Sequence, residues 1–456
     1  MKAFYQKYKP HYTGNLKLAI PVVITQAGHM LTQVSDSVLV GHFVGTIALA
    51  GVSLANNVFI IVMVLGMGIA YGITPLIAQE NGRKNFAECG RLLINSLFIN
   101  SISGIILCLT ILLGFNFVIP YLHQSPLVVE QARPFLYLLG LSMIPMLVFN
   151  TFKQFAQGLG FTKQAMMISI WGNVINIVLG VIFVKGWFGI PPMGIRGVGY
   201  STLIDRCIMA VVMFIYVLRS VHFKKYLQEF AIKNINRVRS FQLYKIGLPV
   251  SLQYIFEVSA FCGAGFIIGT ISPVALAAHQ VALSLASLTY IMASGMADAA
   301  AIKTGNHFGA KNHQALRISA ISSYHLVIAF MSITALTFTF GNHLLPWIYS
   351  SDERVIAIAA QLLIIAAFFQ LFDGTQVIGL GTLRGMGDVN IPAFITFLAY
   401  WILGLPVGYL LGVHYKLGVN GVWYGLTLGL MAASILLFVR FQVMSKKFRY
   451  TDLTSK

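Results

Sequence analysis

Three acidic residues, Asp36, Glu257 and Asp373, lie within stretches of the sequence that are otherwise almost entirely apolar. Glu257 is near the middle of residues 248–269, which have the length and apolarity of a membrane span. A carboxylate at the centre of a membrane helix costs about 2.5 to 3.5 kcal/mol, so such residues usually face the bundle interior and bind an ion or substrate. They are therefore candidates for proton or cation binding, although a neutral carboxyl kept for packing also fits the pattern.

Glu257 and Asp373 fall in the seventh and tenth of the expected spans. If those two helices pack together, the carboxyl groups form one coupled unit that takes up a proton or Na⁺. A Na⁺ ion needs further oxygen ligands, whereas a proton needs no fixed coordination. Both coupling ions therefore remain open.

Asp36 has polar residues that could join it. Asn173 and Asn176 are three residues apart, so they share one face of a helix, and Thr202 starts the next expected span. Such side chains commonly form hydrogen bonds between helices, but beside a buried Asp they also predict a polar site.

The composition identifies the elements that must hold these residues. The chain has 456 residues, of which 57% are hydrophobic and only 10% are charged, whereas a soluble globular protein is about 25% charged. About twelve stretches are long and apolar enough to span a bilayer as helices. The sequence therefore predicts an all-α polytopic membrane protein with twelve transmembrane helices.

The net charge of +18 comes mainly from Lys and Arg residues in the short loops between the expected spans. If twelve spans alternate, most Lys and Arg fall on the side that carries both termini, which is the pattern that orients proteins in an inner (plasma) membrane. We therefore expect cytoplasmic termini, contact with the lipid bilayer and no nucleic-acid partner. Four widely spaced cysteines support neither a disulfide framework nor a zinc site.

An internal repeat organises the spans into two halves. Residues 48–50 and 275–277 are both ALA, an offset of 227, and KLAIP at 17–21 corresponds to KIGLP at 245–249, an offset of 228. Residues 219–242 form the one long basic interruption. We predict a first lobe at 1–218, a cytoplasmic connector at 219–242 and a second lobe with a basic tail at 243–456, which makes two pseudo-symmetric six-helix lobes.

Two other motifs carry less weight. GMGD at 385–388 resembles an element of intramembrane aspartyl proteases, but the equivalent GLGF at 158–161 has Phe161 in place of the acid, as expected of a tight loop. His279 lacks an HxxxH partner, so it fits a polar core residue better than a metal ligand.

The sequence as a whole resembles the multidrug and toxic compound extrusion (MATE) transporters, in particular their NorM-like branch. The similarity extends from about residue 14 to 443. It is carried by the order and spacing of several short pieces: QVSDSVLVGHFVG around Asp36, ALAGVSL, QGLG, GLP…FE ending at Glu257, AAHQVALS around Gln280, and LFDG…LRGMGD around Asp373.

The resemblance implies the MATE fold and export of organic cations in exchange for Na⁺ or H⁺, without a cofactor or catalytic residues. It implies that Glu257 and Asp373 form the cation site of the second lobe, as Na⁺ ligands if sodium is coupled. The first-lobe site, for a cation or proton, is implied to be Asp36, Asn176 and Thr202.

Aromatic and polar residues near the acids complete the expected site. Tyr254, Gln280 and Phe369 are expected to line the substrate cleft, where aromatic faces attract organic cations. Phe369 stands where NorM relatives can have a tyrosine, and Gly180 replaces a second asparagine of the fifth span. These two differences remove potential ion ligands.

We therefore expect a monomeric multidrug efflux antiporter that works by alternating access. The alternatives are a lipid-linked oligosaccharide flippase of the same superfamily, an intramembrane protease that uses Asp388, and a passive channel. A flippase would need a cationic cleft for a pyrophosphate, and a channel does not explain the duplicated lobes.

Overall fold

The structure, a computed structural model, describes residues 2–118 and 125–454, and within these ranges it is helical and contains no strand. Contacts gather the helices into two compact units. We call residues 24–251 the N unit, and residues up to 23 together with those from 252 onward the C unit. The division falls inside two helices, α1 and α9, each of which contributes one segment to each unit.

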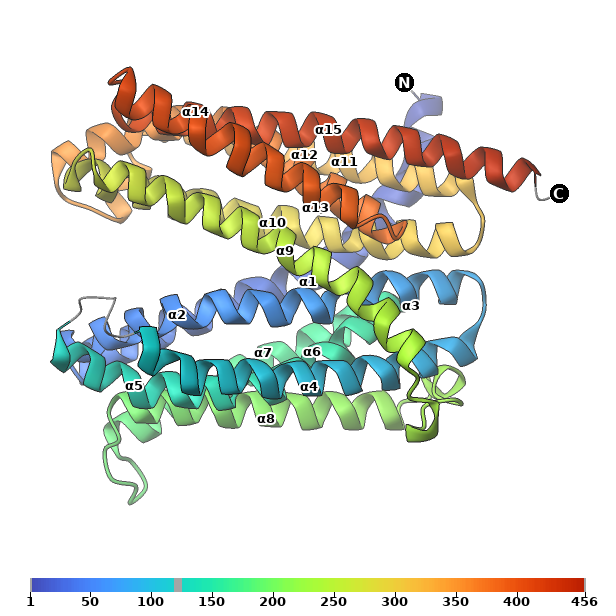
Figure 1. The fold of residues 1–456 in the computed structure, drawn as a ribbon, viewed down its shortest axis with the longest axis horizontal. Helices are drawn as coiled ribbons and strands as arrows, with labels where there is room; N and C mark the ends of the chain where they lie inside the picture. The colour runs from blue at the N-terminus through green and yellow to red at the C-terminus, as the bar shows by residue number, and fades with distance from the viewer. Residues whose placement is uncertain (1, 119–124, 455–456) are drawn as a thin grey trace. The chain divides into compact units, whose positions relative to one another are not determined.

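The N unit contains the second part of α1 (Lys2–Phe43) and the helices up to the start of α9 (Figure 1). These helices are α2 (Thr46–Tyr71), α3 (Ile73–Gly82), α4 (Phe86–Val118), α5 (Pro126–Leu141), α6 (Met143–Gly158), α7 (Thr162–Lys185), α8 (Ile195–Arg219), and the short η2 (Lys224–Tyr226) and η3 (Ile232–Asn234). Single residues, Gly72 and Ser142, separate α2 from α3 and α5 from α6, so each pair forms one continuous span.

The C unit contains the first part of α1, most of α9 (Arg237–Gly269) and all later helices. These are α10 (Pro273–Gly309), α11 (His313–Phe340), η4 (Leu345–Ile348), α12 (Glu353–Gly385), α13 (Asn390–Phe397), η5 (Leu398–Gly404), α14 (Leu405–Tyr409), η6 (Leu410–His414) and α15 (Gly418–Thr454). The segments η5 and η6 are π-helical turns within one span that runs from α13 to η6.

Eleven helical segments among the described residues are long and apolar enough to cross a membrane. Together with α1, which spans 42 residues, they correspond to the twelve predicted helices. The predicted fold class is thus confirmed: the chain is an all-α polytopic protein.

Side-chain caps explain where the helices of the C unit begin. The hydroxyl of Ser272 accepts a hydrogen bond from the backbone N–H of Ala275 at 3.0 Å, and Pro273 occupies the first helical position of α10. Asn312 and Asp352 accept comparable bonds at the starts of α11 and α12. Hydrogen bonds from Arg354 hold the pKa of Asp352, which lies outside the span, below its usual value.

Helix α12 is the centre of the C unit, since it contacts α10, α11 and α15. Gly381 and Gly385, one GxxxG pattern, face the backbone of Ala297 and Ala301 on α10 so closely that a methyl group at either glycine would overlap it. Small residues at this spacing let two membrane helices approach closely. Asp373 is therefore carried by the most enclosed helix of its unit.

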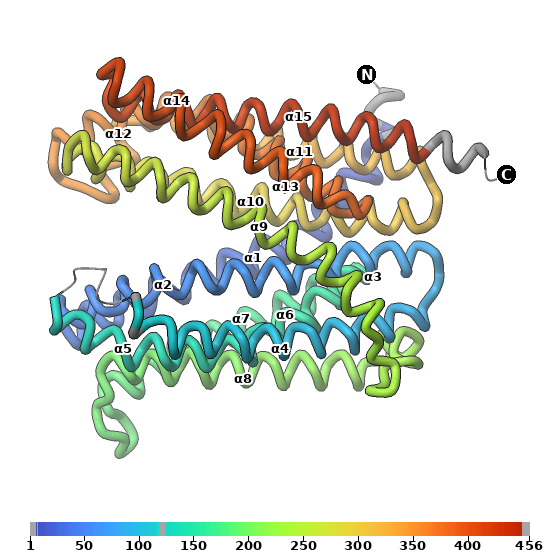
Figure 2. The backbone as a smooth tube through the Cα atoms, viewed as in Figure 1, coloured from blue at the N-terminus to red at the C-terminus, as the bar shows by residue number. Residues whose placement is uncertain are grey.

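A second close approach joins α15 to the span from α13 to η6, which lie side by side in Figure 2. Each partner has glycines four residues apart: Gly404, Gly408 and Gly412 in the span, and Gly421, Gly425 and Gly429 in α15. A Cβ on Gly421 would lie 2.6 Å from the backbone N of Gly412, and one on Gly425 would overlap Gly408. The two backbones thus touch along a ladder of glycines.

The N-terminal residues are tied into the C unit by polar contacts. The Asn15 side chain donates to the Ser323 hydroxyl at 2.8 Å and to the Ser319 carbonyl at 3.2 Å, and the Tyr12 hydroxyl lies 2.9 Å from His325 Nδ1. Helices α1 and α9 change unit after Val23 and Ser251, two residues beyond Pro21 and Pro249, the repeat-related prolines inside them.

Candidate ion and substrate site

The structure places Glu257 of α9 near Asp373 of α12 in the C unit. Both side chains are buried, with 5% and 3% of their surface exposed, and Glu257 interacts electrostatically with Asp373. Glu257 lies on the α9 face that also carries the buried Ala260 and Ala264. Two acids on different helices thus form one enclosed site.

Tyrosines surround this pair, and sequence reasoning did not identify their role. The Tyr290 hydroxyl of α10 donates a hydrogen bond to Glu257. Tyr400 lies in the π-helical turn η5, interacts with both acids and donates to Gln376 Oε1 at 2.9 Å. Isolated π-helical turns are frequent at functional sites because the extra residue re-aims side chains.

The carboxyl groups of the C-unit site are only partly satisfied by hydrogen bonds and have no positively charged partner among the described residues. The Glu257 Oε2 atom is buried and has no hydrogen-bond partner. No Lys or Arg interacts with Glu257 or Asp373 in the part of the chain that the structure describes. A buried carboxylate without a cation is costly, so it either holds a proton or attracts a positive ion. The arrangement can therefore bind a cation or a proton.

In the N unit, Asp36 of α1 meets Asn176 of α7 and Thr202 of α8. The Thr202 hydroxyl donates to Asp36 Oδ2 at 3.5 Å, and the Asn176 amide donates to that hydroxyl at 3.2 Å. Asp36 Oδ1 and Asn176 Oδ1 are buried without hydrogen-bond partners. The predicted polar cluster is thus assembled from three helices.

Arg206 of α8 changes the electrostatics of that cluster. It interacts with the carboxylates of both Asp36 and Asp205, although no basic residue is close to Asp36 in the sequence. Its guanidinium also donates to the Ser142 hydroxyl at 2.6 Å and lies 5.1 Å from the Phe59 ring. Asp36 and Asp205 therefore have a cation nearby, whereas Glu257 and Asp373 have none among the described residues.

The three residues expected to line the cleft occupy different environments. Gln280 is exposed, and Tyr254 is partly buried near Arg384 and Asp298. Phe369 is 2% exposed and belongs to the core, where its ring lies 6.0 Å from that of Phe261 and 5.6 Å from that of Trp423.

Two polar residues that the sequence set aside have structural partners. Trp423 Nε1 donates to His279 Nδ1 at 3.1 Å, and His279 is buried, as expected of a polar core residue. Asp298 forms a 3.0 Å ion pair with Arg384 of α12. Helix packing brings Arg384 close, which spacing along one helix could not indicate.

Comparison with known proteins identifies the chain. The MatE family model matches it twice, at residues 21–182 and 249–410, which together are more than half of its length. The chain belongs to the MatE family. The two matches begin 228 residues apart, the offset of the repeat that the sequence predicted.

Individual MatE relatives match over nearly the whole chain. A probable multidrug resistance protein NorM of Bacillus licheniformis is 31% identical over 445 residues, 96% of each protein. A multidrug resistance protein MdtK of Yersinia pseudotuberculosis is 31% identical over 97% of each.

Solved structures agree on the fold. The eukaryotic MATE transporter AtDTX14 matches with a TM-score of 0.87 at 19% identity, covering 98% of this chain and 100% of that one. A MATE in the bent conformation matches with a TM-score of 0.89 at 20% identity, over 96% of both chains. At these identities the likeness concerns the MATE fold alone.

MatE proteins are transporters rather than enzymes, and the environment of Asp388 agrees with this. Asp388 follows α12 in a turn, and its side chain is only 9% exposed and pairs with Arg440 of α15 at 2.7 Å. An aspartyl protease needs two carboxyl groups that share a water molecule. A carboxylate that is already paired with arginine does not fit that role.

Proposed function

We propose that this MatE protein is a multidrug efflux antiporter that exports organic, mostly cationic amphipathic compounds in exchange for Na⁺ or H⁺. The observation that carries the proposal is the buried pair Glu257 and Asp373, which has no basic partner among the described residues. The names of the relatives, multidrug resistance proteins, support the same kind of substrate.

A difference between the two units supports the C unit as the place where the coupling ion binds. Arg206 partly compensates Asp36 and Asp205, so an entering cation would be attracted less strongly by that cluster. Glu257 and Asp373 have tyrosine neighbours, which supply hydrogen bonds and oxygen atoms but no positive charge. We therefore propose the C-unit pair as the main coupling site and the N-unit cluster as a secondary cation or proton site.

Na⁺ would require more than the two carboxyl groups. No group of three or more His, Cys, Asp or Glu residues that could hold a metal occurs among the described residues. The Tyr290 hydroxyl is an additional oxygen at the same place, and the Oε2 atom of the Glu257 carboxyl group has no partner of its own. Hard cations prefer oxygen ligands, so these residues would fit Na⁺, and either carboxyl group alone can hold a proton.

Transport requires that ion and substrate bind differently in two states of the protein. An ion held by Glu257 and Asp373 adds positive charge to the site, which weakens its attraction for a cationic substrate. The ion can drive the cycle only through unequal affinities in the outward-open and inward-open states. Alternating access would then release the substrate outside and the ion inside.

For the substrate cleft we propose Tyr254 and Gln280, which are not fully buried, together with Phe369 once the core around its ring rearranges. A lipid-linked oligosaccharide is a weaker candidate substrate, because its pyrophosphate would be repelled by Glu257 and Asp373.

We further propose that the protein works as a monomer in the inner membrane with both termini in the cytoplasm. The basic residues of the 219–242 connector and of the C-terminal tail support this orientation. We also retain 1–218 and 243–456 as the two functional lobes joined by that connector.

The decisive experiment measures efflux of a fluorescent organic cation from vesicles under an imposed Na⁺ gradient or an imposed pH gradient. We expect one gradient to drive efflux in the wild type and the Glu257→Gln variant to lose that response. A gradient that drives no efflux is excluded as the source of energy. Failure of both gradients would contradict antiport.

A further inference from the structure

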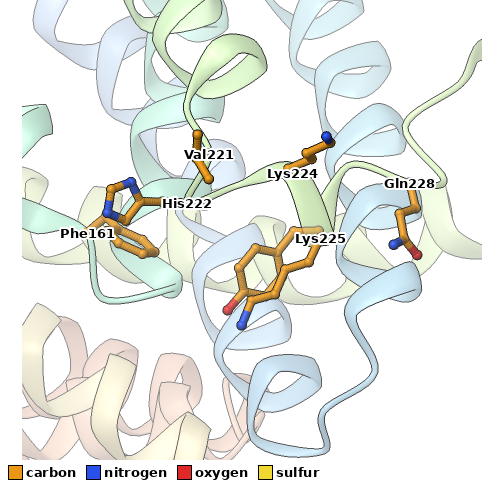
Figure 3. Close-up of a pocket in the computed structure, with 7 residues that line it drawn as sticks. Phe161, Val221, His222, Lys224, Lys225 and Gln228 are labelled. Carbon is orange, nitrogen blue, oxygen red and sulfur yellow. The ribbon is translucent and has the colours of Figure 1, made fainter.

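A pocket of about 550 Å³ lies at the end of the N unit where α7 begins and α8 ends. Figure 3 shows Phe161 and His222 together on one side, Gln228 on the other and Lys225 between them. The rings of Phe161 and His222 are 5.4 Å apart and meet edge to face. The full lining consists of Phe161, Val221, His222, Lys224, Lys225, Tyr226 and Gln228.

The pocket is positively charged, and no acidic residue lines it. Neither Lys224 nor Lys225 forms an ion pair with a carboxylate of the described residues. The Lys225 ammonium instead lies 4.4 Å from the centre of the Phe86 ring and 4.8 Å from that of Tyr226. Two adjacent lysines without a counter-charge favour binding of an anion.

Two arginines of this region are paired with the nearby carboxylates. Arg91 pairs with Glu88 at 3.3 Å and with Glu229 at 3.6 Å, and Arg239 also pairs with Glu88. The carboxylates of the neighbourhood are therefore engaged elsewhere. Only an anion from outside the chain remains to balance Lys224 and Lys225.

The position of the pocket indicates what kind of anion it meets. Helices α7 and α8 pack against each other and expose apolar side chains, including Trp171 of α7 and Ile215 and Leu218 of α8. Val221, in the pocket wall, is 83% exposed. In a bilayer these apolar faces contact acyl chains, so the pocket at their end lies at the level of the phospholipid headgroups.

We propose that this pocket binds the headgroup of an anionic phospholipid such as phosphatidylglycerol. Lys224 and Lys225 contact the phosphate, the Gln228 amide hydrogen-bonds to the polar headgroup, and the acyl chains extend along the apolar faces of α7 and α8. A free phosphate would bind the two lysines but, without acyl chains, would make no contact with the apolar faces of α7 and α8. This site is independent of the ion site proposed above.

The test uses the full-length protein in detergent and native mass spectrometry to measure the affinity for short-chain phosphatidylglycerol and for phosphatidylcholine. We expect the wild type to prefer phosphatidylglycerol and the Lys224→Gln/Lys225→Gln variant to lose that preference by about tenfold or more. The Lys224→Arg/Lys225→Arg variant keeps both charges and should keep the preference. The matched control, Lys233→Gln/Lys245→Gln, removes two exposed lysines outside the pocket lining and should behave as the wild type.

Equal affinity for the two lipids in the wild type would overturn the proposal, and so would an unchanged preference in the glutamine variant. Inorganic phosphate is added at millimolar concentration as a competitor. Lack of displacement supports a lipid site, whereas displacement of phosphatidylglycerol would show a free-anion site instead. If the glutamine variant does not fold, the wild-type preference should still fall as salt concentration rises, and a salt-independent preference would contradict the proposal.

Discussion

The Tyr290 hydroxyl of α10 donates a hydrogen bond to Glu257 of α9, and so joins a third helix to the acidic pair. A hydrogen bond to a charged group contributes about 1.5 to 3 kcal/mol. We expect Tyr290→Phe to keep the fold but to reduce ion-driven efflux about tenfold, because Glu257 loses a ligand that orients it.

The measurement for Tyr290→Phe is the initial rate of efflux at several concentrations of the driving ion. Tyr424→Phe, which alters an exposed tyrosine, is the control. We expect the Tyr290 variant to require more ion for half-maximal efflux. An unchanged ion requirement would show that the hydroxyl acts only in packing.

Neutralising either carboxylate of the pair should uncouple transport. We expect Glu257→Gln and Asp373→Asn each to lower ion-driven efflux by about tenfold or more, with normal amounts of folded protein, because an amide neither gains nor releases a proton and attracts Na⁺ only weakly. Drug resistance of cells that express each variant gives the readout. Glu130→Gln, an exposed acid on α5, should have no effect. Full resistance in both site variants would refute the coupling role.

Arg206 should stabilise the N unit through its two acidic neighbours. Replacing it with Gln removes the positive charge that interacts with Asp36 and Asp205, so two buried carboxyl groups lose a compensating charge. We therefore expect a clearly lower midpoint of thermal unfolding in detergent.

A double-mutant cycle checks this explanation. Adding Asp36→Asn to the Arg206→Gln variant should restore part of the lost stability, with a coupling free energy of about 1 kcal/mol or more. The exposed Arg219→Gln is the control. Strictly additive effects would mean that Arg206 acts through Ser142 and Phe59 alone.

The glycine ladder between α15 and its neighbour should not tolerate even one methyl group. Gly425→Ala should destabilise the protein by about 1 to 3 kcal/mol, because the new methyl overlaps the Gly408 backbone. Gly114→Ala is the matched variant: no atom lies within 4 Å of its Cβ, so alanine should stabilise that helix by up to about 1 kcal/mol. We expect Gly425→Ala to lower the midpoint of thermal unfolding and Gly114→Ala to raise it. Equal changes in the two variants would contradict close backbone contact at Gly425.

Much of the fold followed from the sequence because membrane helices leave strong local signals. The lengths of the apolar stretches predicted the membrane spans, and the similarity of the KLAIP and KIGLP segments predicted the duplication. The GxxxG spacings at 381–385 and 421–429 were an available signal for close packing that we did not use.

The partners of the buried acids were harder to predict than the acids themselves. A carboxylate within a membrane span costs free energy, so the sequence alone marks Glu257 as a candidate site residue, whichever helices pack around it. Tyr290 and Arg206 reach Glu257 and Asp36 from other helices, so their spacing in the sequence does not connect them with these acids. Arg384 and Asp298, which are 86 residues apart, meet only because α10 and α12 pack together.

The division of helix α1 between the two units affects the order in which contacts can form during synthesis. The N unit is a continuous stretch of chain, so all of its residues have been synthesised once residue 251 has left the ribosome. The segment around Asn15 belongs to the C unit, and its partners Ser319 and Ser323 do not yet exist at that time. The segment around Asn15 is thus synthesised long before its partners, and it can form these contacts only after much of the C unit has been made.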